Sequence, residues 1–259
     1  MLDQHLLKDQ VAKSFSDAAK EYDQYARIQH KLAHDLLNLC PQQDKKQILD
    51  LGCGTGYCLP LLNKLYPNAH LTGGDLAPGM LQHAKQHHPD FEYQISDAEN
   101  LPFEDNQFDL VFSSLAVQWC DDFSRVLKNA YRCLKPGGHL VLSNLANGTL
   151  CEMKEAWHQV DENQHVNEFA SWQELGDTVN ASDFNVIKID QVTHKDYHPN
   201  VRSLTDSLKR IGAHNITQGR AKGLTSPATI KRFKQAIEKY RDEQGLPASY
   251  QVFSCVLEK

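Results

Sequence analysis

Short apolar runs alternate with amphipathic segments between residues 47 and 145, and this alternation constrains the fold more than any other feature. Short apolar runs predict buried strands, and apolar spacings of three and four predict helices. The expected strands span residues 48–51, 69–75, 91–96, 108–113 and 139–144. The expected helices run up to residue 65, over 78–87 and over 122–134, where Lys135-Pro136-Gly137-Gly138 ends the last one. Strands separated by helices predict a parallel sheet with helices on both faces.

The sequence on either side of this alternation is predicted to be mostly helical. Apolar spacings over residues 11–39 predict an amphipathic helix, broken once, that ends before Pro41. Beyond Ala146 we expect helices over 150–160, 172–179, 201–211 and 229–240, and strands over 184–192 and 250–257. A segment of about 50 residues is marginal for a core of its own. The helices within residues 195–245 are therefore interpreted as an insertion between two closing strands of one domain over 1–259.

Composition excludes several classes of protein. Of 259 residues, 41% are hydrophobic and 23% charged, so we expect a globular chain rather than a disordered one. No apolar run reaches the roughly 18–20 residues that a membrane span needs. Residues 1–10 carry charges and no apolar signal core, which favours a cytoplasmic location. Seven cysteines without a C-x-x-C pair argue against a disulfide framework and against a zinc site.

The charge is unevenly distributed along the chain. The net charge is −6, so we expect no general affinity for nucleic acid. Residues 195–241 nevertheless contain eleven lysines and arginines against three acids, a net charge of +8 that leaves −14 for the rest. A basic segment on an acidic chain favours a local acidic partner.

A glycine-rich loop, Gly52-Cys53-Gly54-Thr55-Gly56, follows the first expected strand. Glycine lets the backbone approach a ligand where a side chain would clash. The spacing G-x-G-x-G differs from the nicotinamide fingerprint G-x-G-x-x-G, and the lysine of a P-loop is absent. Asp50, Asp75 and Asp97 lie at three successive strand ends, where parallel sheets bind ligands, and Asp75 suits a ribose diol. A ligand site is therefore favoured over a glycine turn without a ligand.

Five motifs together resemble the class I S-adenosylmethionine-dependent methyltransferases. They are ILDLGCGTG over residues 48–56, Asp75, SDAENLPF over 96–103, FDLV over 108–111 and LKPGG over 134–138. The resemblance implies a Rossmann-like α/β fold with a seven-stranded, mostly parallel sheet whose last strand is antiparallel, plus N-terminal helices and the helical insertion. It also implies S-adenosylmethionine as cofactor and S-adenosylhomocysteine as product. Residues 1–45 would then form a helical lid, 46–146 the cofactor-binding core and 147–259 the acceptor-side half.

The same resemblance implies roles for individual residues. Gly52, Gly54 and Gly56 would line the methionine and ribose, and Asp75 would take the ribose hydroxyls. Asp97 with Ala98 would hold the adenine, and Asp50 would reach the methionine amino group directly or through water, whereas Asp109 is structural. The implied cofactor set is Asp50, Gly52, Cys53, Gly54, Gly56, Asp75, Leu76, Asp97, Ala98, Ser114 and Leu115.

A narrower resemblance covers about residues 10–254. Its most distinctive piece is LAVQWC over residues 115–120, accompanied by motifs at 14–22, 147–150, 156–161, 208–213 and 219–220. These segments resemble the malonyl-acyl-carrier protein O-methyltransferases of biotin synthesis. The resemblance implies methylation of the free malonyl carboxyl, with an acidic acyl-carrier protein as the partner of the basic segment. Malonyl-CoA stays open as an alternative substrate, because it carries the same thioester group.

Methyl transfer to a carboxylate needs positioning rather than acid–base chemistry. A carboxyl group with a pKa of about 4 is ionised at neutral pH, so no general base is expected. The expected positioning residues are Tyr22, a lid residue unless it is simply a core aromatic, and Gln118 and Trp119 at the acceptor pocket. A cation would hold the carboxylate. The candidates for the carboxylate and the carrier are Arg202, Lys209, Arg210, Arg220, Lys231, Arg232 and Lys234, with a solvated helix face as the alternative for each.

Two other functions remain open at this point. A methyltransferase for a small diffusible acceptor, such as a quinone precursor or another carboxylic acid, has no use for a basic carrier-docking face. A non-catalytic S-adenosylmethionine-binding protein would bind cofactor without turnover. The histidine pairs His30/His34 and His83/His87 have no H-E-x-x-H context or third ligand nearby, so no metal is expected.

Overall fold

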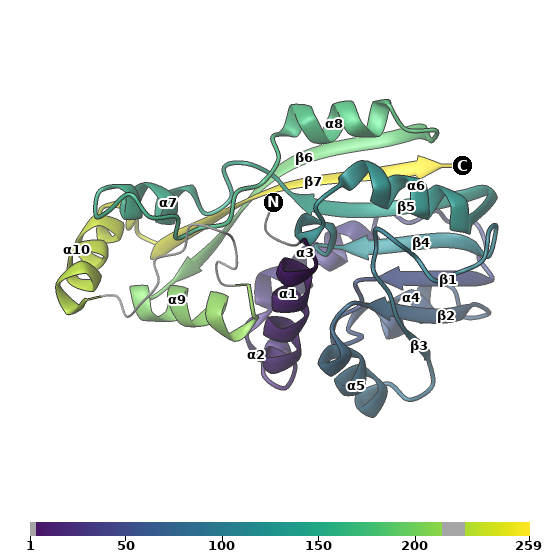
Figure 1. The fold of residues 1–259 in the computed structure, drawn as a ribbon, viewed down its shortest axis with the longest axis horizontal. Coiled ribbons are helices and arrows are strands. Elements are labelled where there is room, and N and C mark those ends of the chain that lie inside the picture. The colour runs from purple at the N-terminus through teal and green to yellow at the C-terminus, as the bar shows by residue number, and fades with distance from the viewer. Residues whose placement is uncertain (1–3, 214–225) are drawn as a thin grey trace.

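Strand β1, which leads into the glycine-rich loop, lies within a seven-stranded sheet of order β3-β2-β1-β4-β5-β7-β6 (Figure 1). The structure is a computed structural model and describes residues 4–213 and 226–259. Strands β1 to β5 pair in parallel, and β7 is antiparallel to both β5 and β6. The strands are β1 Gln47–Leu51, β2 His70–Asp75, β3 Glu92–Ile95, β4 Phe108–Ser114, β5 Leu134–Leu145, β6 Asn185–His198 and β7 Leu246–Glu258. The expected fold class, with its antiparallel last strand, is confirmed.

Helices precede the sheet, connect its strands and form an insertion before the last strand. The N-terminal and connecting helices are α1 Gln4–Ala18, α2 Tyr22–Tyr25, α3 Arg27–Leu37, α4 Cys58–Leu65, α5 Pro78–His87, η1 Val117–Trp119 and α6 Phe123–Cys133. The later helices are α7 Cys151–His158, α8 Trp172–Asn180, α9 Val201–Arg210, α10 Pro227–Ile237 and η2 Glu238–Tyr240. Each helix within residues 4–213 and 226–259 is too short or too polar to cross a bilayer.

Alternating side chains of the central strands build two cores, one on each face of the sheet. Ile48 packs with α3 and α4 in one core, whereas its neighbour Leu49 packs with α6 and α8 in the other. Strand β4 alternates in the same way, with Leu110 and Phe112 on the first face and Val111 on the second. Both faces are therefore covered, as the near-continuous apolar runs predicted.

A third core lies away from the centre of the sheet, where β6 and β7 extend past the other strands (Figure 1). Helices α7, α9 and α10 pack there with α3 against the first half of β7, through residues such as Leu204, Phe233 and Tyr250. The insertion between β6 and β7 thus shares its core with α3 and β7. This arrangement agrees with the insertion expected from the sequence.

Several element boundaries differ from the sequence prediction. The N-terminal region forms three helices, because the chain turns after Ala18 and again at Ala26, which is fully buried. Strand β5 starts at Leu134 rather than at residue 139, because Gly137 and Gly138 exchange backbone hydrogen bonds with Lys259 at 2.9 Å. Strands β6 and β7 are also longer than expected, since the third core covers their extension.

Candidate active site

The glycine-rich loop leaves β1 at the carboxyl edge of the sheet and leads into α4. The Gly52 N–H donates to the Gly74 carbonyl at 2.7 Å, which holds the loop against the end of β2. Gly52 has a φ of +74°, and a Cβ there would lie 2.1 Å from the Cβ of Ala116. Gly54 has a φ of +54° and open space where its Cβ would project. Side chains are thus excluded at Gly52 by packing, while Gly54 leaves room for a ligand.

Asp75, at the end of β2, is organised by backbone donors. Its carboxylate accepts the N–H of Gly54 at 2.9 Å and the N–H of Ala77 at 2.8 Å. Burial raises the pKa of Asp75, although these backbone N–H groups oppose the rise by favouring the charged form. The carboxylate is therefore fixed in orientation beside the glycine loop.

Asp50, at the end of β1, is deeply buried, with an exposed fraction of 2%. In the described part of the chain, its Oδ2 atom has no hydrogen-bond partner. Burial, followed by the charge of Asp75, raises the pKa of Asp50 to about 8. A buried carboxyl oxygen without a partner is costly, so this group fits a cationic ligand atom such as an amino group.

A cavity of about 120 Å³, called here the glycine-loop cavity, opens beside these residues. Eight of the eleven predicted cofactor residues line it: Gly52, Gly54, Asp75, Leu76, Asp97, Ala98, Ser114 and Leu115. Asp50, Cys53 and Gly56 are not in its lining. Cys53 is buried, and its sulfur packs against Gly73, while Gly56 packs against Ala84. Acidic side chains, a glycine backbone and an unpartnered buried carboxyl oxygen fit the hydroxyls and amino group of S-adenosylmethionine.

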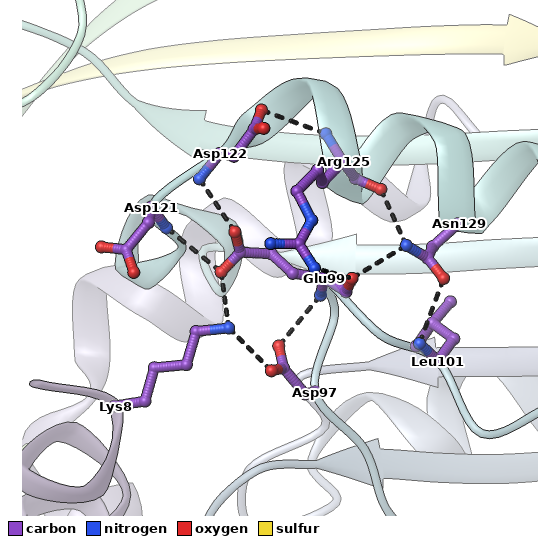
Figure 2. A network of polar contacts seen from close by, with 8 residues as sticks. All are labelled: Lys8, Asp97, Glu99, Leu101, Asp121, Asp122, Arg125 and Asn129. Carbon is purple, nitrogen blue, oxygen red and sulfur yellow. Dashed lines mark hydrogen bonds and ion pairs between the residues drawn. The ribbon is translucent and has the colours of Figure 1, made fainter. Parts of the chain in front are cut away.

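Lys8 of α1 lines the same cavity, a role the sequence did not indicate. Its Nζ lies 2.7 Å from Asp97 Oδ2 and 2.7 Å from Glu99 Oε2 (Figure 2). Burial alone would lower the pKa of Lys8, but the two carboxylates outweigh it and raise the pKa. Glu99, only 2% exposed, also accepts the backbone N–H groups of Asp121 and Asp122. Lys8 thus fastens α1 across the loop that follows β3, 89 residues away in the sequence.

A second cavity, of about 170 Å³, lies on the other side of a shared wall and is called here the Gln118 cavity. Both cavities are lined by Phe15, Tyr22, Leu115 and Trp119. The rings of Phe15 and Trp119 meet edge to face, with centroids 5.3 Å apart. Burial raises the pKa of Tyr22, so its phenol stays neutral. The three predicted positioning residues all border the Gln118 cavity, and Tyr22 and Trp119 lie between the two.

The predicted cations are distributed over different environments. Lys209 of α9 lines the Gln118 cavity. Arg210 instead pairs with Glu21 and lies over the ring of Tyr25, and Arg202 pairs with Asp206 at 3.4 Å on the surface. Lys231, Arg232 and Lys234 are exposed on α10, and Arg220 lies outside the described residues. Lys209 alone, of the six described candidates, lines that cavity.

Comparisons with known proteins agree with this geometry. A methyltransferase domain model matches residues 49–142. A solved structure, a complex between the Haloferax volcanii Trm112 methyltransferase activator and a putative methyltransferase, shares the fold with a TM-score of 0.62. It is 20% identical, covering 94% of this chain and 96% of that one. Fold and site therefore define a class I S-adenosylmethionine-dependent methyltransferase.

Curated relatives define the family within this class. The malonyl-acyl-carrier protein O-methyltransferase of Hahella chejuensis is 38% identical, over 96% of this chain and 90% of that protein. The biotin biosynthesis bifunctional protein BioHC of Cellvibrio japonicus is 41% identical over 96% of this chain, which spans 50% of that longer protein. The chain belongs to the malonyl-acyl-carrier protein O-methyltransferase family.

Proposed function

We propose that this chain transfers a methyl group from S-adenosylmethionine to the free carboxyl of malonyl-acyl-carrier protein, an early step of biotin synthesis. The observation that carries the proposal is the wall of Phe15, Tyr22, Leu115 and Trp119 shared by two cavities. A methyl donor in one cavity and an acceptor in the other would meet at that wall. The malonyl methyl ester and S-adenosylhomocysteine would be the products.

The glycine-loop cavity is proposed to hold the cofactor. Asp50, which does not line the cavity, would reach the methionine amino group directly or through water, Asp75 would take the ribose hydroxyls, and Asp97 with Ala98 the adenine. The backbone at Gly52 and Gly54 would lie against the methionine and ribose, since the open space at Gly54 admits a ligand there. When bound, S-adenosylmethionine supplies a methyl group made electrophilic by its sulfonium.

The protein's own contribution is positioning. A malonyl carboxylate is ionised at neutral pH and needs no base. Tyr22, Gln118 and Trp119 would hold it in line with the methyl group and keep water out, because desolvation strengthens the attack of an anion on a cation. Neutral Tyr22 can donate a hydrogen bond to the carboxylate without competing for its charge. Once the carboxylate is methylated, its charge is lost and a cation no longer retains it.

The cations divide into two groups under this proposal. Lys209, at the Gln118 cavity, would hold the acceptor anion, with Arg202, Arg210 and Arg220 as the other candidates. Lys231, Arg232 and Lys234 would form a docking face for the acidic carrier on the exposed side of α10. Malonyl-CoA, which carries the same thioester group, is a second candidate substrate.

The proposal also assigns parts to the chain. Residues 1–45 would act as a lid, 46–146 as the cofactor-binding core and 147–259 as the acceptor-side half. Support for the lid comes from α1, whose Lys8 and Phe15 line the glycine-loop cavity. We also propose that the reaction takes place in the cytoplasm. All seven cysteines are free thiols, which is typical of proteins in a reducing compartment.

The test is mass spectrometry of malonyl-carrier protein and of malonyl-CoA after separate incubation with the purified chain and S-adenosylmethionine. We expect one methyl group on the malonyl moiety, gained faster on the carrier than on CoA. Equal rates on the two substrates would support the proposed reaction and contradict the proposed docking face on α10. Methylation of neither substrate, with the cofactor tightly bound, would overturn the carboxyl acceptor and favour a small diffusible one.

A further inference from the structure

Three amide side chains around the Gln118 cavity have oxygens without partners. Among the described residues, six buried side-chain polar atoms lack a hydrogen-bond partner, and three of them are Gln29 Oε1, Gln118 Oε1 and Asn167 Oδ1. All three residues line the Gln118 cavity. Buried amide oxygens are normally satisfied, because an unmade hydrogen bond costs free energy. Half of the unsatisfied atoms thus gather around one cavity, which points to a ligand that supplies the missing donors.

The three amides come from separate parts of the fold. Gln29 lies on α3, Gln118 on η1, and Asn167 in the segment between α7 and α8. Gln118 is anchored, since its Nε2 donates to the Leu115 carbonyl at 2.6 Å while its oxygen stays unpartnered. Convergence of three unrelated elements on one cavity is typical of a binding site rather than of a local packing defect.

The unpartnered atoms are acceptors, and this restricts the ligand. A malonyl carboxylate is ionised at neutral pH and has no proton to donate, so it cannot satisfy an amide oxygen. The complementary groups are N–H donors. A malonyl thioester on a pantetheine arm combines both requirements, because the arm contains two secondary amides behind the sulfur.

We propose that Gln29 and Asn167 bind the amide N–H groups of the pantetheine arm that carries the malonyl group. The proposal rests on the proposed function and adds to it a recognition element for the arm. A site built to hydrogen-bond a substrate N–H rejects an analogue that lacks it, because the buried acceptors are then left unpaired. These two residues would therefore select pantetheine thioesters over small malonyl compounds. The arm is common to acyl-carrier protein and to CoA.

The test compares three substrates at saturating S-adenosylmethionine: malonyl-carrier protein, malonyl-CoA and malonyl S-ethyl thioester, which has no amide. The variants are Gln29→Leu and Asn167→Leu, which keep approximate volume and remove the acceptor. Gln24→Leu is the matched control, because Gln24 is an exposed glutamine of α2 that does not line the cavity. Calorimetric binding of S-adenosylhomocysteine and of S-methyl pantetheine, which has both amides and no malonyl group, gives a readout independent of turnover.

We expect each variant to lower kcat/KM for both pantetheine thioesters about fivefold to tenfold, the usual effect of one hydrogen bond. The S-ethyl thioester should change less than twofold, affinity for S-methyl pantetheine should fall, and S-adenosylhomocysteine affinity should stay constant. A loss with the carrier thioester alone would assign the subsite to the carrier-bound arm.

Equal losses with all three substrates, or no loss with any, would overturn the proposal, because the amides would then be structural or idle. Reduced S-adenosylhomocysteine affinity in both variants would overturn it as well. If the wild type methylates none of the three substrates, the proposed function itself fails. That result is distinguishable from a failure of the amide proposal alone.

Discussion

The carboxylates that line the glycine-loop cavity are held by the protein, whereas the polar groups around the Gln118 cavity include amide oxygens that lack protein partners. Asp75 is held by backbone N–H groups, and Asp97 by Lys8 and the N–H of Glu99. Gln29, Gln118 and Asn167 each present an unpartnered oxygen. The difference teaches that the carboxylates lining the first cavity are oriented by the protein itself, whereas the amide oxygens at the second are left for a ligand to satisfy under our proposal.

The chain supplies these two sites in different ways. The glycine-loop cavity takes most of its polar lining from strand ends between residues 51 and 120, with α1 and α2 closing it. The Gln118 cavity draws on α1 to α3, η1, the segments around α7, then α9 and β7. Substitutions that separate cofactor binding from acceptor binding can therefore test whether the two sites are independent.

The largest effect is expected from Gly52→Ala. Its Cβ would lie 2.1 Å from the Cβ of Ala116, at a φ of +74°. We expect about a 100-fold loss of cofactor affinity, roughly 2.7 kcal/mol, because the loop must move out of the cavity. Calorimetric titration with S-adenosylhomocysteine measures it.

Gly137→Ala is the control for this substitution. Gly137 has a similar φ of +76°, open space around its Cβ position and a place remote from both cavities. The Gly137→Ala variant should lose only about 1–2 kcal/mol of stability, the conformational cost of alanine at a positive φ. Equal cofactor affinity in the two variants would contradict a steric role for Gly52.

Asp50→Asn tests the unpartnered carboxyl of Asp50, in contrast to the carboxylate of Asp75, which backbone N–H groups hold. The pKa of Asp50 is raised to about 8, so the folded chain keeps a proton that the unfolded chain releases near pH 4. The free energy of unfolding of the ligand-free protein should therefore fall between about pH 4 and pH 8. Asp50→Asn should flatten this dependence and weaken cofactor binding about 30-fold, since it removes the counter-charge of the amino group.

Urea unfolding at several pH values, with and without the substitution, tests the titration. Cofactor affinity of the wild type should rise with pH toward 8 as the carboxyl ionises. A pH dependence of stability that is identical in both proteins would show that Asp50 titrates normally. Unchanged cofactor affinity in Asp50→Asn would contradict a contact between Asp50 and the methionine amino group.

Lys209→Met is expected to act on the acceptor side alone. Lys209 lines the Gln118 cavity, and removing a charged partner of the malonyl anion should raise KM for the acceptor about tenfold. Cofactor affinity should not change. Lys188→Met on β6 is the control, because Lys188 lines neither cavity and pairs with Asp190 on the surface. Similar kinetics in the two variants would show that Lys209 is solvated.

Lys8→Met is expected to act on the cofactor side, through the lid. The Lys8 ammonium joins α1 to Asp97 and Glu99, so its removal should speed cofactor dissociation about fivefold, within the usual range for a charged hydrogen bond (Figure 2). Stopped-flow fluorescence with S-adenosylhomocysteine measures the rate. Lys13→Met, which breaks an exposed pair with Asp17 on the same helix, should leave the rate unchanged. Matching rates in both variants would contradict a fastening role.

The smallest effect is expected from charge reversal on α10. Changing Lys231, Arg232 and Lys234 to Glu should raise KM for malonyl-carrier protein about threefold at low salt, and less at high salt, because exposed charges are screened. KM for malonyl-CoA should stay constant. The control changes the exposed Lys64, Lys85 and Lys128 to Glu, which alters the net charge by the same amount outside α10. An equal effect of both reversals would show that only overall charge matters.

The sequence by itself determined the parallel part of the sheet and most of the glycine-loop cavity, whereas the antiparallel last strand followed from the resemblance to class I methyltransferases. The spacing of apolar residues and the turn residues are local properties that the sequence displays directly. Parallel strands then bring their carboxyl ends to one edge of the sheet. Asp75 and Asp97 could therefore be placed from their positions after strands. The extra length of β5 could not, because Gly137 and Gly138 bond with Lys259 at the far end of the chain.

Only the tertiary structure decided the contacts between distant surfaces. Lys8 meets Asp97 across 89 residues, and Gln29 reaches the same cavity as Asn167 through helix packing. No local pattern in the sequence marks such pairs, since each depends on how helices dock. Among the described basic candidates, the structure placed Lys209 at the cavity and paired Arg210 with Glu21. Two neighbours on one helix thus differ in environment because successive side chains point about 100° apart.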